Sequence, residues 1–212
     1  MIDSRVICGK IIWAFSWVML VWPLLDSQAL AHHVIDGDVP ATSLVGFISG
    51  LGHPIVDLEH LAFIIGVGFV AWLHKRTYSL PLLFLIGMIV GVFVQFNFRE
   101  LYSIEVAIAI SVMVMGTLVV WPRTLNTRAV LLAIGVAGVL HGYSYGAIIL
   151  GAGPFPIAGY LIGLLLVQFG VMMLVVNLVD RLKTQAQARI LLRTGGTGVL
   201  LVGLAFVTKS LI

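Results

Sequence analysis

Residues 54–73 read PIVDLEHLAFIIGVGFVAWL, and this stretch decides the fold. Apart from acidic residues and a histidine near its start, the stretch is continuously apolar. Its length matches the roughly 20 residues of α-helix that cross the hydrocarbon core of a bilayer. It lacks the period-two alternation of membrane-barrel strands, so a helix is the structure that satisfies its backbone in lipid.

Five more apolar runs of similar length follow, separated by short polar segments. They cover residues 80–98, 104–121, 129–150, 157–179 and 190–208. A further apolar stretch, 42–51, is only half a span long, and it either extends the first helix outward or forms a re-entrant half-helix. Gly50, Gly52 and Pro54 indicate a break after it, because proline suits the first turn of a helix. We therefore expect an all-α, polytopic bundle of six transmembrane helices with a short half-helix at 42–51.

The composition supports a membrane protein. Hydrophobic residues make up 60% of the chain and charged residues 10%, whereas soluble domains carry about 25% charged residues. The net charge of +3 comes from scattered basic residues, which is not the pattern of a nucleic-acid-binding surface. The one cysteine, Cys8, excludes disulfides and thiolate metal sites from the rest of the chain. No phosphate-binding loop or dinucleotide motif is present, so we expect no nucleotide cofactor.

The N-terminal segment has the features of a secretory signal peptide. Basic residues precede the apolar run 11–25, and Ala29-Leu30-Ala31 fits the small-residue rule for cleavage. We expect a signal peptide at 1–31 and a single transmembrane domain at 32–212. The alternative is an uncleaved first helix, but the run is short for a span.

Basic residues gather in alternate loops and predict the orientation. The first, third and fifth loops hold eight of them: Lys75, Arg76, Arg123, Arg128, Arg181, Lys183, Arg189 and Arg193. The second loop has Arg99 and the fourth has no charge. By the positive-inside rule the odd loops face the cytoplasm. We therefore expect a multi-pass protein of the bacterial cytoplasmic membrane, with the mature N-terminus and the C-terminus outside.

Four ionisable residues at the outer end of the first span form the candidate site: His53, Asp57, Glu59 and His60. On one continuous helix, His53, Asp57 and His60 fall within about 60° of one another, and Glu59 lies about 100° from His60. Glu59 therefore needs a helix distortion, or a long reach, to join the others. Charges in spans cost about 2.5–3.5 kcal/mol each and usually mark function. Imidazole and carboxylate together suit a divalent transition metal: nickel, cobalt, copper or zinc. The alternative is that these groups cap the helix and bind neighbouring helices.

Other polar residues are predicted in the same outer half of the membrane. Glu105 begins the third span, and His141 lies about 13 Å below the outer end of the fourth, compared with about 9 Å for His60 below residue 54. His141, with Tyr143 and Tyr145 close by, has either a structural role or a role in the metal site. His32 and His33 would begin the mature chain and capture metal outside, or form part of a hydrated leader.

Three stretches resemble the HupE/UreJ family of nickel and cobalt permeases. They are SGLGHPIVDLEHLAFIIGVG at 49–68, YSIEVAIAISVMVMG at 102–116 and LHGYSYGA at 140–147. The family's first motif, His, five residues, Asp-His, corresponds to His53, Glu59 and His60. Its acidic position in the third helix corresponds to Glu105, and the histidine of its second motif corresponds to His141.

The chain departs from the family pattern at two positions. Glu59 stands where the family has aspartate, and Ile148 stands where it has a glutamate after the second motif. Asp57 is a candidate to replace the displaced carboxylate. The loss at Ile148 leaves open a change of metal, weaker transport or a different role.

The resemblance implies a permease for a divalent transition-metal ion, nickel first and cobalt or copper next. The predicted ligands are His53, Asp57, Glu59, His60, Glu105 and His141, with capture by His32 and His33. Without an ATP-binding motif, transport would be passive, driven by the membrane potential, or energised by a partner. Two alternatives remain: a metal- or haem-binding assembly subunit of a membrane complex, and an intramembrane metalloenzyme. We expect no enzyme activity, and a homo-oligomer or a membrane-complex partner is compatible with the sequence.

Overall fold

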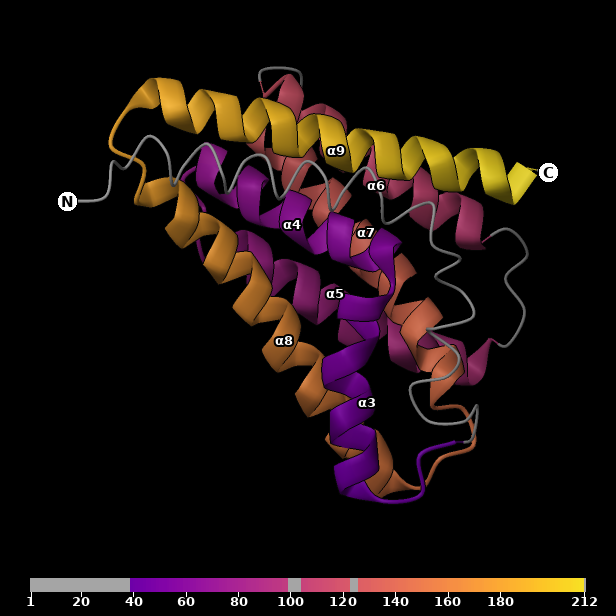
Figure 1. Cartoon of the computed structure of the whole chain (residues 1–212). Coiled ribbons are helices and arrows are strands. Elements are labelled where there is room, and N and C mark those ends of the chain that lie inside the picture. The colour runs from indigo at the N-terminus through magenta and orange to yellow at the C-terminus, as the bar shows by residue number, and fades with distance from the viewer. Residues whose placement is uncertain (1–38, 99–103, 123–125, 212) are drawn as a thin grey trace.

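The computed structural model of the protein describes residues 39–98, 104–122 and 126–211, and this part of the chain is all-helical (Figure 1). Its seven helices are α3 (Ser43–Val56), α4 (Leu58–Leu73), α5 (Ser79–Asn97), α6 (Ile104–Val120), α7 (Thr127–Ile148), α8 (Pro154–Asp180) and α9 (Gln185–Leu211). The predicted all-α fold is thus confirmed. The predicted signal peptide at 1–31, with His32 and His33, lies outside the described residues.

Several of these helices are long and apolar enough to cross a membrane. Four of them, α5, α7, α8 and α9, meet that test singly. Helices α3 and α4 meet it only as a pair, bent by 80°, which is the geometry of a broken span or a re-entrant loop. Helix α6 is equally apolar but has 17 residues. Within the described residues the chain is therefore a multi-pass membrane protein with up to five long spans and one shorter apolar helix.

The break between α3 and α4 lies at Asp57, and the prediction of a break at Gly50, Gly52 and Pro54 was wrong. Pro54 stands inside α3, in its last turn. Asp57 ends α3 with an extended backbone and begins α4 as its N-cap. Its Oδ1 accepts hydrogen bonds from the backbone N–H groups of Glu59 at 3.0 Å and His60 at 3.5 Å. These bonds satisfy donors that a helix start leaves free, and the negative charge suits the helix dipole.

Helix α4 forms the centre of the bundle. Every residue from 58 to 71 except Leu61 is buried. Three helix pairs surround it: α5 packs on α7, α3 lies along the first part of α8, and α9 lies along α6 (Figure 1). A central helix that is buried on all sides can hold polar side chains away from lipid, which is the setting of the candidate site.

Glycines allow the paired helices to approach closely, as small residues do at helix interfaces in membranes. A Cβ at Gly142 of α7 would collide with the backbone of Met88 on α5. On α8, a Cβ at Gly159 or Gly163 would collide with the backbone of α3. At Gly146 it would lie 2.9 Å from the Gln95 side chain. These contacts fix α7 against α5 at the level where α7 carries its histidine.

Candidate functional site

His60 lies in the first turn of α4, directly below the bend. Its Nδ1 lies 3.1 Å from Oδ2 of Asp57, close enough for an ion pair when the imidazole is protonated. The His60 side chain is 4% exposed and that of Asp57 is 25% exposed. Nε2 of His60 is buried and has no hydrogen-bond partner in the described part of the chain. The bend therefore places the partly exposed Asp57 carboxylate against Nδ1 of the buried His60 ring. The opposite ring nitrogen, Nε2, is left without a hydrogen bond to the described protein.

His141 comes from α7 and is fully buried beside α6. Its Nε2 lies 3.0 Å from Oγ of Ser111, and the same hydroxyl donates to the carbonyl oxygen of Ile108 at 2.7 Å. A serine hydroxyl has one proton. Since that proton goes to Ile108, Oγ can only accept from His141, which assigns the imidazole proton to Nε2. Nδ1 of His141 then carries the lone pair, and it is buried with no partner among the described residues.

The imidazole rings of His60 and His141 are neighbours. The sequence predicted only that the two histidines lie at similar depths, and the structure brings them into contact. Their ring centroids lie 4.9 Å apart, with the ring planes at 89°. Tyr145, one helical turn after His141, lies 4.5 Å from His60 between ring centroids. Its hydroxyl is also buried without a described partner. Three polar groups from α4 and α7 therefore share one buried space.

Aromatic rings enclose this space on the side of α4 and α5. Phe63 lies 4.1 Å from His141 between ring centroids, and Phe84 lies 5.9 Å from it. Both phenylalanines are fully buried. They exclude water from the histidine pair, which strengthens any interaction of the imidazoles with a charge.

His53 lies at the more exposed side of the cluster. Its ring centroid is 6.3 Å from that of His60 and 5.7 Å from that of Tyr145. It reaches the cluster from the last turn of α3, across the bend. Helical spacing predicts His53, Asp57 and His60 on one face of a continuous helix. The three residues do come together, but a bend between two helices brings them there.

Glu59 is buried, and its Oε1 has no described hydrogen-bond partner. The bend at Asp57 lies before Glu59 and His60, which are consecutive residues of α4, so it does not change the spacing of these two around the helix. Glu105 of α6 and Lys209 of α9 lie within range of a charge interaction with Glu59, and Glu105 itself is exposed. Glu59 thus borders the histidine cluster from α4 itself, and Glu105 and Lys209 approach Glu59 from α6 and α9.

The described side chains do not form a ready-made metal cage. No group of three or more histidine, cysteine, aspartate or glutamate residues in the described ranges is close enough to hold one ion. The structure instead brings together the His60 and His141 imidazoles, each with a ring nitrogen that has no described hydrogen-bond partner, and the Tyr145 hydroxyl. So few potential ligands are compatible with fast exchange of an ion and not with a closed structural metal site.

Two features of the cluster were missed or underrated by sequence reasoning. Ser111, which orients His141, is an isolated serine in an apolar run and gives no distinctive pattern. Tyr145 stands four residues after His141 and so on the same helix face, a spacing that would have placed it in the site.

Ile148, which stands where the family has a glutamate, lies at the end of α7 and is partly buried against the apolar core.

Comparison with known proteins agrees with this architecture. The family described as HupE / UreJ protein matches residues 19–206. Protein HupE of Rhizobium leguminosarum bv. viciae is 30% identical over 124 residues, which cover 58% of this chain and 61% of that relative. No solved structure matches the chain. Because the family match extends over most of the sequence, the chain belongs to the HupE/UreJ family.

Proposed function

We propose that the protein is a permease that carries a divalent transition-metal ion, nickel first and cobalt or copper next, across the bacterial cytoplasmic membrane. One observation carries the proposal: His60 and His141 are adjacent, and each has one ring nitrogen close to an oxygen, at 3.1 Å from Asp57 and 3.0 Å from Ser111 respectively. The other ring nitrogen of each has no hydrogen-bond partner among the described residues. Metal-binding histidines usually have this arrangement, because a hydrogen bond at one nitrogen fixes the ring and makes the other a better ligand.

The surrounding residues suggest an order of contacts for the ion. Asp57 is partly exposed and lies against His60, and His53 borders both His60 and Tyr145. An incoming cation would first meet the Asp57 carboxylate and His53, then pass to His60 and His141. Glu59 is the neighbour of His60 in the chain and Glu105 lies within interaction range of Glu59, so both are candidate ligands beside this route. His32 and His33 remain candidates for capture outside, in the predicted orientation with both termini outside.

Transport in proteoliposomes tests the proposal. The unmodified protein should accumulate radioactive nickel, and His60→Ala should reduce the initial rate at least tenfold at equal protein incorporation. His74→Ala is the matched control, because His74 ends α4 at the opposite end from the cluster. Equal uptake by the unmodified protein and His60→Ala would overturn the proposal, and competition by cobalt and copper would rank the metals.

The haem-binding alternative is less well supported by the geometry. An iron ligated by two histidines holds a porphyrin between the two rings. Rings whose centroids lie 4.9 Å apart and whose planes are perpendicular leave no such space between His60 and His141. The metalloenzyme alternative needs a nucleophile or base besides the predicted ligands, and among the described residues of the cluster the Tyr145 hydroxyl is the one group left for that part.

A further inference from the structure

A second polar site lies at the other end of the bundle from the histidine cluster, where α4 and α8 end and α9 begins. A cavity of about 720 Å³ opens there between these three helices and α6. This volume falls within the range of pockets that hold small organic ligands. The positive-inside pattern assigns this end of the bundle to the cytoplasmic side of the membrane.

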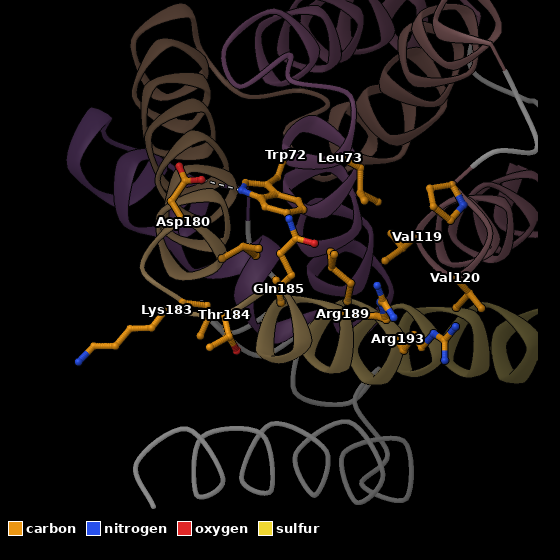
Figure 2. Close-up of a pocket in the computed structure, with 15 residues that line it drawn as sticks. Trp72, Leu73, Val119, Val120, Asp180, Lys183, Thr184, Gln185, Arg189 and Arg193 are labelled. Carbon is orange, nitrogen blue, oxygen red and sulfur yellow. Dashed lines mark hydrogen bonds between the residues drawn. The ribbon is translucent and has the colours of Figure 1, made fainter. Parts of the chain in front are cut away.

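The charges around the cavity favour an anion. Arg189 and Arg193 line it and lie four residues apart on one face of α9, with both guanidinium groups below Val119 and Val120 (Figure 2). Neither arginine forms an ion pair with a carboxylate in the described part of the chain. The one acidic residue of the lining, Asp180, accepts a 2.6 Å hydrogen bond from Nε1 of Trp72. The positive end of the α9 dipole adds to the potential of the arginines.

Most of the remaining lining is apolar and suits a lipid. Leu73, Val119, Val120 and Leu192 form one wall of the cavity. The Trp72 indole lies over Gln185, and the Lys183 side chain extends away from the cavity (Figure 2). Tryptophan with a polar partner is typical of the membrane–water interface. Arginine is the residue that pairs best with phosphate through two parallel N–H groups.

We propose that this cavity binds the phosphate headgroup of an anionic phospholipid, with Arg189 and Arg193 on the phosphate and the apolar wall against the start of the acyl chains. Basic pockets between transmembrane helices on the cytoplasmic side bind such headgroups in other proteins. The site is separate from the histidine cluster and does not depend on the transport proposal.

Lipid-dependent thermal unfolding of the full chain in neutral detergent tests the site. Phosphatidylglycerol should raise the melting temperature of the unmodified protein, whereas phosphatidylcholine should not. In the Arg189→Gln/Arg193→Gln variant the apparent affinity for phosphatidylglycerol should fall by about thirtyfold, the share expected for two basic residues. Arg76→Gln/Arg181→Gln is the matched control, because it removes two charges from the same end outside the cavity lining, and it should bind as the unmodified protein does.

Two outcomes of the unfolding experiment would overturn the proposal. One is an equal phosphatidylglycerol shift in both double variants and the unmodified protein. The other is an equal shift with inorganic phosphate alone, which would assign the arginines to a free anion and not to a lipid. Native mass spectrometry of the unmodified protein covers the case in which the variant does not fold: retention of phosphatidylglycerol in preference to phosphatidylcholine is expected, and equal retention contradicts the assignment. His60→Ala should retain phosphatidylglycerol as the unmodified protein does.

Discussion

Replacement of Ser111 by alanine separates a metal site from ordinary helix packing. In the structure, Oγ of Ser111 accepts from Nε2 of His141 and thereby leaves Nδ1 as the free nitrogen. Without the hydroxyl, the imidazole loses its only described hydrogen bond, and neither its orientation nor its protonated nitrogen stays fixed. Alanine fits the space of serine, so the backbone of α6 should not change.

The two interpretations of the Ser111–His141 contact predict effects of different size. A hydrogen bond between transmembrane helices contributes about 0.6 kcal/mol on average, which corresponds to a factor of roughly three in an equilibrium. Removing the group that orients a metal-binding histidine costs about 10–100-fold in metal affinity. The loss of about 10–100-fold in metal affinity exceeds the roughly threefold packing effect. The measured loss on replacing Ser111 therefore shows whether the hydroxyl serves helix packing or orients His141 as a ligand.

Isothermal titration of the purified protein with nickel measures this loss. We expect Ser111→Ala to weaken nickel binding by about 10–100-fold while the melting temperature changes little. Thr117→Ala is the control on the same helix, because within the described residues the Thr117 hydroxyl bonds to the backbone of its own helix alone, at Met113. An affinity of Ser111→Ala within threefold of the unmodified protein would refute the assignment of His141 as an oriented ligand.

Three further substitutions test two other residues of the site and the helix packing beside it. Asp57→Asn keeps a side-chain oxygen to cap α4 but loses the charge beside His60. Nickel transport should therefore fall at least tenfold, while circular dichroism shows an intact fold. Unchanged transport would contradict a role of the Asp57 carboxylate in binding the ion or orienting His60. Tyr145→Phe removes a buried hydroxyl without a described partner, so the melting temperature should stay equal or rise while nickel affinity falls severalfold; a lower melting temperature would show that the hydroxyl is bonded. Gly142→Leu should destabilise the protein by about 1–3 kcal/mol or more in thermal unfolding, because its side chain collides with α5; Gly170→Leu, with open space around it, should be nearly neutral, and similar losses at both sites would contradict the packing.

The helices could be predicted from the sequence because each apolar run is long and bounded by polar residues. The path of the chain at residue 57 could not. Pro54 and two glycines indicated a break, but the proline is accommodated in the last turn of α3. The competing factor was Asp57, whose carboxylate caps the next helix and fixes the bend there. Capping by a short acidic side chain was therefore decisive, and the proline was not.

The candidate site could be predicted in its residues but not in its geometry. His60 and His141 were recognised as ionisable groups in apolar runs and placed in the same outer half of the membrane, but their contact was not predicted. Helical spacing alone placed His53 and His60 on one surface, whereas they face one another across the bend. The Ser111 contact depends on how α6 and α7 pack, which the sequence of neither helix specifies.

X-ray absorption spectroscopy of the nickel-loaded, purified protein tests the central claim most directly, because it identifies the atoms bound to the ion. We predict scattering from two imidazoles in the unmodified protein and in His74→Ala. His60→Ala and His141→Ala should each lose one of them. A nickel spectrum that stays the same in the His60→Ala/His141→Ala variant would contradict the claim that this histidine pair holds the transported ion.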